Sequence, residues 1–149
     1  MTTGEGGPSR LFSFVITLFR PNASDPEELI RFGDAHLREG RLDLALKAYS
    51  KAARADPGTS AEKKVAQVYG MMGRYMEAIA SLDRAAAIDP ADSFAWMGRG
   101  FLFLRLEMRR KALESFKRAA YLDPENGYAR YLIFETAEEI RRMEASPRR

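Results

Sequence analysis

The chain has 149 residues, a formal net charge of +3 and 46% hydrophobic residues, which is typical of one soluble globular domain. It has no cysteine and one histidine, so the sequence excludes disulfides, thiolate zinc sites and thiol catalysis and leaves no second imidazole for a His-rich metal site. The charge is too small to indicate nucleic-acid binding, and no apolar run approaches the roughly 20 residues that span a bilayer.

Residues 1–24 are predicted to form a leader that contains the longest apolar run, LFSFVITLF at residues 11–19. A signal peptide is disfavoured because Glu5 precedes this run and Arg20 and Pro21 follow it, whereas a secretory signal has a basic start and a small-residue cleavage site. The run is therefore expected to stay in the protein, where its apolar side chains need cover from water.

Three later segments align with one another, at residues 43–57, 76–90 and 110–124. Each ends in Asp-Pro and has alanines twelve and five residues before its proline, and the prolines are 33 and then 34 residues apart. Between the two alanines lies a large apolar residue, which is Tyr49, Leu82 or Phe116. A fixed period of this length indicates a helical repeat protein, in which small residues let helices approach to about 8–10 Å and larger side chains fill the space between them.

These features resemble the tetratricopeptide repeat, a helix-turn-helix unit of about 34 residues. Counting back from each proline places the starts of the first helices at Pro26, Thr59 and Ser93. The family's tryptophan, glycine and tyrosine positions are best matched in the third repeat, by Trp96, Gly100 and Phe103. The resemblance implies an all-α fold, a right-handed α-solenoid of paired helices.

The repeats are predicted within a domain of residues 25–143, at 26–58, 59–92 and 93–126. Their helix pairs are expected at 26–39 with 42–55, 59–72 with 75–88, and 93–106 with 109–122, before a capping helix at 127–143 and a basic tail at 144–149. Asp25 is expected to cap the first helix, and residues 59–62 match a capping box. The family's turn glycine is matched by Gly40 and Gly73, but the third repeat has Glu107 there.

In this family the first helix of each pair lines a concave groove. The resemblance implies that five positions of each first helix and of the capping helix point into the groove. Twelve of these side chains are the candidate binding site: Ile30, Asp34, Leu37, Lys63, Gln67, Met71, Phe94, Met97, Phe101, Leu104, Tyr128 and Tyr131. Most of them are apolar, and aromatic residues and methionine are enriched at protein interfaces. The groove is therefore predicted to bind an apolar peptide or helix, with the alternative that several of these side chains pack between helices.

Some family members bind the terminal carboxylate of heat-shock chaperones through a clamp of lysine, asparagine and arginine. The corresponding places here hold Ile30, Asp34, Lys64, Phe94 and Gly98. Only Lys64 is basic, and Asp34 would repel a carboxylate, so the clamp function is not expected in this chain.

The apolar run at residues 11–19 is a candidate occupant of the groove, in its own molecule or in a neighbouring copy. Its apolar contacts would come from Phe12, Phe14, Val15, Ile16, Leu18 and Phe19. Extended, nine residues span about 30 Å, which is comparable to the length of a groove made by four first helices spaced about 10 Å apart. Two alternatives stay open: a short helix packed outside the first repeat, and a weak anchor on a membrane surface.

The sequence thus predicts a scaffold or adaptor module that binds a protein or peptide partner, with self-association through residues 11–19 as the alternative. No catalytic constellation is found, since the chain lacks cysteine and His36 matches a packing position of the repeat. No cofactor, metal or nucleic acid is expected, a membrane partner is disfavoured, and a cytoplasmic location is predicted.

Overall fold

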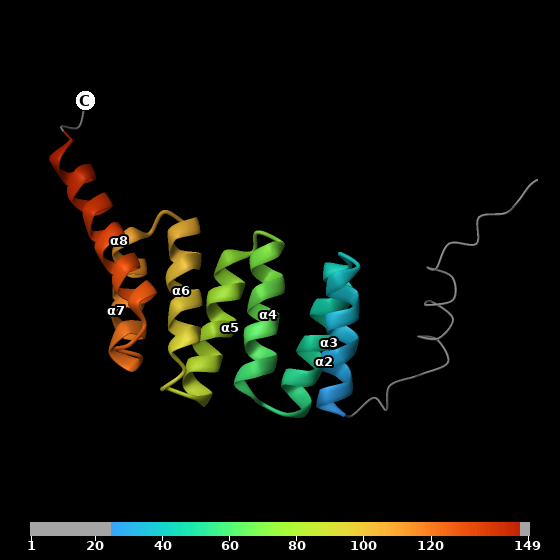
Figure 1. The fold of residues 1–149 in the computed structure, drawn as a ribbon. Helices are drawn as coiled ribbons and strands as arrows, with labels where there is room; N and C mark the ends of the chain where they lie inside the picture. Colours follow the sequence, from blue (N-terminus) through green and yellow to red (C-terminus); the bar gives the residue numbers. More distant parts are fainter. Residues whose placement is uncertain (1–24, 147–149) are drawn as a thin grey trace, which may run out of the picture.

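The computed structural model describes residues 25–146, which form seven α-helices (Figure 1). The predicted leader with its apolar run, at residues 1–24, and residues 147–149 lie outside the described part. The helices are α2 (Pro26–Arg38), α3 (Leu42–Ala55), α4 (Thr59–Met71), α5 (Tyr75–Ile88), α6 (Ser93–Arg105), α7 (Arg109–Leu122) and α8 (Gly127–Ala145). They confirm the predicted helix positions to within one residue, except that α8 runs two residues beyond the predicted end at residue 143.

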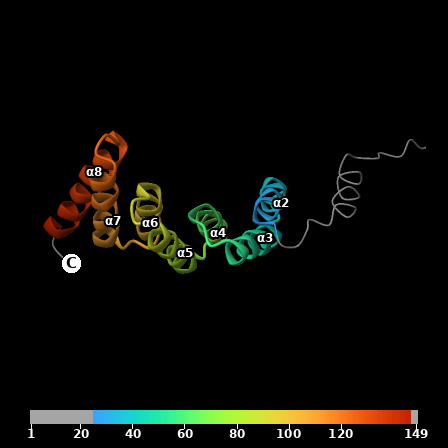
Figure 2. The same ribbon diagram turned by 90° about the horizontal axis from the view of Figure 1, so that it is seen from below.

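The helices are arranged as a solenoid in which each helix packs against the next one along the chain. Seen from below, α2, α4 and α6 lie along one side of the array and α3 and α5 along the other (Figure 2). The array is curved, with the first helices on its inner side (Figure 2). The described residues contain no strand, and the predicted all-α solenoid fold is confirmed.

In the first and third helix pairs, a glycine of the first helix packs against a buried aromatic ring of the second helix, and this contact lets the two helices approach closely. A Cβ added to Gly33 of α2 would lie 2.5 Å from the Tyr49 ring of α3, and one added to Gly100 of α6 would overlap the Phe116 ring of α7. Both rings are fully buried. Only a residue without a side chain allows such an approach, which is why glycine stands at these two places in the repeat.

Helix ends follow local capping chemistry. The Asp25 side chain accepts a hydrogen bond from the Glu27 backbone N–H at 3.0 Å, which confirms the predicted cap. The predicted capping box at residues 59–62 is wrong, because the N-cap of α4 is Gly58. The Glu62 carboxylate instead accepts a hydrogen bond from Arg84 at 2.9 Å, an interaction between helices that the local pattern does not encode.

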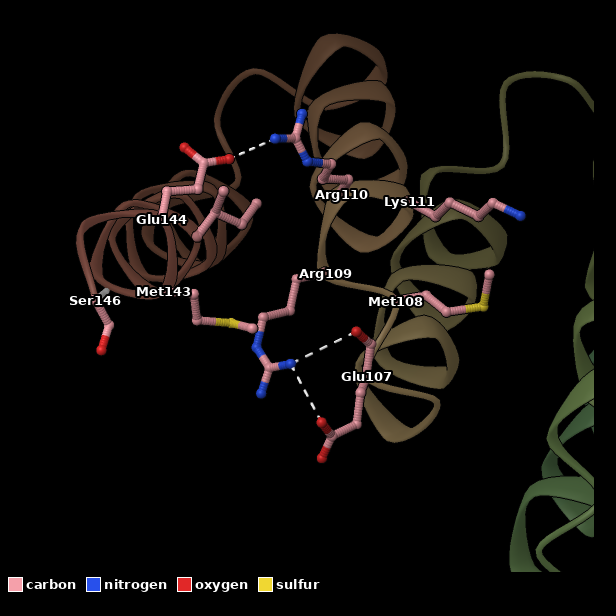
Figure 3. Close-up of a pocket in the computed structure, with 9 residues that line it drawn as sticks. Glu107, Met108, Arg109, Arg110, Lys111, Met143, Glu144 and Ser146 are labelled. Atoms are coloured by element: carbon pink, nitrogen blue, oxygen red, sulfur yellow. Dashed lines mark hydrogen bonds and ion pairs between the residues drawn. The ribbon is translucent and has the colours of Figure 1, made fainter. Parts of the chain in front are cut away.

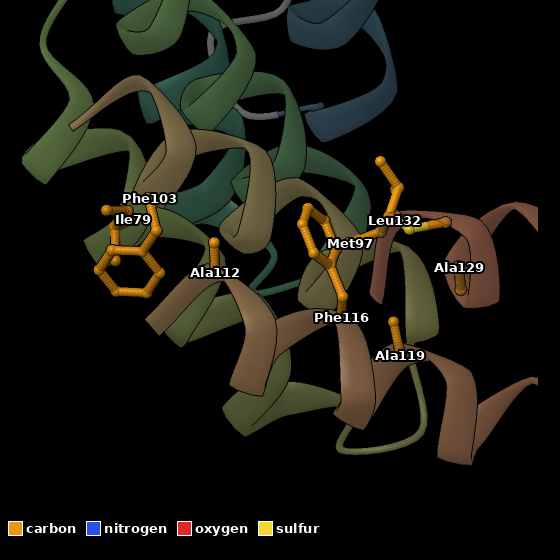
Figure 4. Close-up of a cluster of buried hydrophobic side chains, with 8 residues drawn as sticks. All are labelled: Ile79, Met97, Phe103, Ala112, Phe116, Ala119, Ala129 and Leu132. Atoms are coloured by element: carbon orange, nitrogen blue, oxygen red, sulfur yellow. The ribbon is translucent and has the colours of Figure 1, made fainter. Parts of the chain in front are cut away.

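The core is a series of apolar clusters along the array. The largest one joins four helices, α5 to α8 (Figure 4), through Ile79, Met97, Phe103, Ala112, Phe116, Ala119, Ala129 and Leu132. A second cluster joins α3 and α4 through Ala45, Tyr49, Val65 and Val68. Each repeat thus buries its apolar face against a neighbour, as solenoids do.

His36 lies in this core, as predicted. It is buried, and its ring meets the Phe32 ring edge-on with centroids 4.4 Å apart. Burial, together with the nearby Arg41 guanidinium, lowers the pKa of His36 below its ordinary value. The imidazole is therefore held neutral at physiological pH.

The turns within the pairs require a left-handed backbone. Gly40 and Gly73 have φ angles of 72° and 75°, and Glu107 has a φ of 59° at the equivalent place in the third pair. A side chain disfavours this conformation, so the third turn is the strained one. Among the described helices, none has both the length and the apolar character required to cross a membrane.

Candidate functional site

A pocket of about 530 Å³ opens between α4 and α6 on the inner side of the array. It is lined by Lys63, Ala66, Gln67, Gly70, Met71, Tyr75, Leu82, Phe94, Gly98, Phe101, Leu102 and Arg105. Most of the lining is apolar, and the polar groups stand around it. Concave apolar sites with a few polar groups are the usual sites of ligand binding.

Two glycines create this pocket. A Cβ added to Gly98 would lie 3.1 Å from Cδ1 of Leu82, and one added to Gly70 would lie 3.6 Å from Cδ2 of Leu102. Because both positions lack a side chain, the two leucines form a floor that a ligand can reach. Glycine costs a helix about 1 kcal/mol relative to alanine, so two glycines in facing helices are notable.

The predicted groove residues divide into two sets. Met71, Phe94 and Phe101 line the pocket and are 56%, 70% and 37% exposed, and Gln67 beside them is exposed. Tyr128 and Tyr131 are also exposed, on α8. The other apolar members pack into the core clusters, and these are Ile30, Leu37, Met97 and Leu104.

The exposed aromatic residues form a row from α6 to α8. The Phe101 and Tyr128 rings have centroids 6.3 Å apart, and the Tyr128 and Tyr131 rings are stacked at 6.2 Å. Phe101 also meets the buried Phe116 ring edge-on at 5.4 Å. This row extends the apolar surface of the pocket toward α8, so the exposed predicted residues form one surface.

Asp34, at the α2 end, is engaged inside the protein. Its Oδ1 accepts hydrogen bonds from the Tyr49 hydroxyl and from Nζ of Lys64, both at 2.6 Å. Partial burial alone would raise the pKa of Asp34, but these two hydrogen bonds, together with the positive charges of Lys64 and Arg38, hold the pKa below its ordinary value. Burial and the bonded Asp34 carboxylate raise the pKa of Tyr49. Asp34 and Lys64 therefore neutralise each other.

The remaining charges of the pocket differ in their partners. Lys63 pairs with Asp92, with Nζ and Oδ2 2.5 Å apart. Arg105 donates to the Tyr75 hydroxyl, 3.1 Å from its Nη2, and has no carboxylate partner among the described residues. The pocket thus presents one cation, Arg105, that an acidic group of a ligand can approach.

A second pocket, of about 900 Å³, lies between the start of α7 and the end of α8 (Figure 3). Its apolar lining is Met108, Ile140 and Met143. Two of its cations are paired, Arg109 with Glu139 at 3.0 Å and Arg110 with Glu144. None of the predicted groove residues lines it, and its charges are largely satisfied within the chain.

Sequence reasoning missed several residues of the first pocket. Tyr75 and Leu82 come from α5, a second helix, whereas the prediction considered first helices alone. Glycines inside α4 and α6 were the available signal, because a missing side chain exposes what lies beneath it. The described residues hold no cluster of histidine, aspartate and glutamate that could bind a metal ion.

Solved structures share this fold. The crystal structure of MamA superposes with a TM-score of 0.74 at 20% identity, over 87% of this chain and 75% of MamA. The NMR structure of the first TPR domain of human RPAP3 superposes with a TM-score of 0.73 at 21% identity, over 85% of this chain and 100% of that domain. The first TPR of Spaghetti (RPAP3) bound to the HSP90 peptide SRMEEVD superposes with a TM-score of 0.72 at 20% identity, over 82% of this chain and 98% of that one. At these identities the likeness shows the fold alone.

Two curated relatives match in sequence. Tetratricopeptide repeat protein 37 of Xenopus laevis is 30% identical over 131 residues, which are 86% of this chain and 8% of that protein. Superkiller protein 3 of Schizosaccharomyces pombe is 32% identical over 72 residues, 48% of this chain and 5% of that protein. The chain spans less than a tenth of the length of either relative.

The repeat pattern itself is matched by a family model. The model described as tetratricopeptide repeat matches residues 29–60 and 66–126, which together are more than half of the chain. These two ranges contain most of α2 to α7. The period of the sequence, the pairing of the helices and the match to the family model all indicate the same repeat. The chain belongs to the tetratricopeptide-repeat family.

Proposed function

We propose that this chain is a protein-interaction module, a scaffold or adaptor, that binds an apolar peptide or helix of a partner in its concave groove. The observation that carries the proposal is the pocket between α4 and α6, which Phe94, 70% exposed, and Met71, 56% exposed, flank on its open side. Exposed apolar surface next to a concavity marks interaction sites. A pocket of this size has room for more than one apolar side chain of a partner.

The fold neighbours support binding of a peptide as the mode of interaction. The Spaghetti (RPAP3) domain holds an HSP90 peptide, and the TPR2B domain of yeast Sti1 forms a complex with pHsp70. The partner chemistry proposed here is different, because Lys64 is engaged by Asp34 and Phe94 and Gly98 stand at two further clamp places. The groove therefore favours apolar side chains over a terminal carboxylate.

Affinity capture with a matched pair of variants tests the proposal. Phe94→Glu places a charge at the mouth of the pocket, and Tyr121→Glu makes the same kind of change at a 74% exposed aromatic residue of α7, outside the pocket. We expect a protein that is retained by the wild type and by Tyr121→Glu to be lost from Phe94→Glu, with equal helicity in all three. Equal retention by all three chains would contradict the groove assignment.

A second candidate function is self-association through residues 11–19, which lie outside the described residues. It is favoured by the coexistence of an apolar run and an exposed apolar groove in one chain. Deleting residues 1–20 tests it: we expect a smaller mass if the run docks in a neighbour, and more dye binding to the groove if it docks in its own molecule. An unchanged mass together with unchanged dye binding would rule out both forms.

A further inference from the structure

One position in the first helices is reserved for close contact. Gly33, Ala66 and Gly100 stand at this position, 33 and then 34 residues apart, and the same step of 34 reaches Phe134 in α8. At Gly33 and Gly100 an added Cβ would overlap a ring of the following helix. A helix that followed α8 and packed as α3 and α7 do would therefore meet the whole Phe134 side chain. This face of α8 is built for a different neighbour.

The outer face of α8 consists of Phe134 and the residues one helical turn to either side. Phe134 is 61% exposed, Arg130 is exposed, and Ala137 and Glu138 are partly exposed. The opposite face of α8 carries its buried residues, Ala129, Leu132 and Thr136. Residues three and four apart share a helix face, so the outer face presents an aromatic ring between an arginine and a glutamate.

The charges on this face are arranged symmetrically about the ring. Arg130 lies four residues before Phe134, and Glu138 lies four residues after it. If two α8 helices cross antiparallel at Phe134, Arg130 lies opposite the partner's Glu138, and Glu138 lies opposite the partner's Arg130. Such reciprocal contact is what a two-fold interface requires. Arg130 has no carboxylate partner among the residues that the structure describes, so it is available for this contact. Glu138 is paired with Arg141 of its own helix, but Arg141 is exposed, and surface ion pairs of this kind contribute little and can be exchanged for the partner's Arg130.

We propose that the outer face of α8 docks on the same face of a second copy of this chain, antiparallel, with the two Phe134 rings at the two-fold axis. Ala137 leaves room beside each ring for the partner helix. This surface borders the groove surface, because Tyr131 lies three residues before Phe134 on α8, and it does not involve residues 11–19. It would bring two grooves into one assembly.

The size of the surface sets the strength of the contact. The helix α8 has 19 residues and is about 28 Å long. The surface area that one pair of such helices buries is near or below the roughly 1,200 Å² at which specific interfaces begin. The dimer is therefore reversible, and its population depends on concentration in the micromolar range and above. The Arg130–Glu138 contacts fix the antiparallel direction rather than supply most of the affinity.

The test is the molar mass of the full chain by sedimentation equilibrium from about 1 µM to 1 mM. We expect the wild type to pass from monomer to dimer, Phe134→Glu to stay monomeric, and Tyr121→Glu, changed at another exposed aromatic residue, to dimerise like the wild type. Helicity checks that each variant is folded, which is expected because both side chains are exposed.

Charge reversal distinguishes this arrangement from any other dimer. Arg130→Glu and Glu138→Arg each place like charges opposite one another twice per dimer, so we expect each to weaken dimerisation about tenfold. The double variant restores opposite charges across the axis and should recover most of the wild-type affinity. A wild type that is monomeric throughout, or a double variant no better than the single ones, overturns the proposal. So does a dimer that survives Phe134→Glu but is lost when residues 1–20 are deleted.

Discussion

The first and third helix pairs use the same two repeat positions in different ways. In the first pair the buried ring is Tyr49, and its hydroxyl donates to Asp34 at 2.6 Å. In the third pair the buried ring is Phe116, and the position of Asp34 is occupied by Phe101, which meets that ring edge-on at 5.4 Å. In the first pair, Asp34 is held by a hydrogen bond inside the protein. In the third pair, Phe101 at the same position is exposed to solvent.

This difference locates the binding surface. At the α2 end the groove positions serve the fold, since Asp34 holds Tyr49 and Lys64, and Ile30 and Leu37 pack into the core. From α4 to α8 most of the groove positions are exposed, and most of the exposed ones are apolar: Met71, Phe94, Phe101, Tyr128 and Tyr131. A repeat protein can therefore assign stability and recognition to different repeats while it keeps one backbone.

The largest expected effect on stability comes from breaking the polar contact of the first pair. Asp34→Ala leaves the fully buried Tyr49 hydroxyl and Lys64 without their acceptor, so we expect the free energy of unfolding to fall by about 1–3 kcal/mol. Urea unfolding measures it. Adding Tyr49→Phe to Asp34→Ala makes the first pair like the third and should recover part of the loss. If the double variant is as unstable as the sum of the single changes, the hydroxyl is not what Asp34 stabilises.

The next effect concerns the pocket at the other end. Gly98→Leu fills the space above Leu82 with a side chain, so a partner loses the burial of its apolar anchor, worth about 1.5–3 kcal/mol or tenfold and more in affinity. Retention of the captured partner measures this loss. Gly127→Leu adds the same side chain at the exposed start of α8 and serves as the control. Equal retention by the two variants would place the anchor elsewhere on the surface.

A smaller effect is expected at the third turn. Glu107 has a φ of 59°, where the first two pairs have glycine. Replacing it with glycine removes a left-handed strain of about 1 kcal/mol, and its ion pair with Arg109 is an exposed one that contributes little. We expect Glu107→Gly to raise the thermal midpoint and Glu107→Ala, which keeps the strain, not to. The third pair would then be less stable than its repeat pattern allows, because of the strained turn at Glu107.

The helices could be predicted from the sequence because their cause is periodic. Alanine and glycine positions, Asp-Pro ends and the Asp25 cap repeat or act locally, and the predicted bounds match all seven helix starts and come within a residue of six of the seven C-terminal ends. The end of α8 lies two residues past the predicted one, although a local signal marks it: Ser146 precedes Pro147 in the sequence, and a residue before proline disfavours the helical conformation. The prediction missed this end because the last helix lacks the Asp-Pro that ends the second helix of each repeat.

The groove could be predicted only in part. Ile30, Lys63 and Met97 share one repeat position, yet the first and third pack in the core and the second forms an ion pair at the pocket. The ammonium group of lysine stays near the surface, whereas isoleucine and methionine are often buried, so one repeat position serves both uses. The pocket itself arises from Gly70 and Gly98. The prediction considered side chains that project into the groove, so it missed positions at which there is no side chain.

The smallest expected effect is a pH dependence confined to the first pair, which holds the single histidine of the chain. Burial holds the pKa of His36 below its ordinary value of 6.5. Above pH 7 the imidazole is neutral both folded and unfolded, so it has no effect on stability there. As the pH falls below 6.5, the unfolded chain takes up a proton that the folded chain resists, and stability decreases.

Hydrogen exchange read helix by helix between pH 7 and 5 measures this effect. We expect α2 and α3 to lose protection, after correction for the intrinsic exchange rate, while α6 and α7 do not. Asp34 does not contribute in this range, because its pKa is below its ordinary value of 3.8 and it stays ionised. His36→Phe keeps an aromatic ring against Phe32 and should remove the pH dependence. Equal loss of protection in both pairs would mean that the solenoid unfolds as one unit. The two ends of the solenoid would then differ in their binding surface but not in their stability.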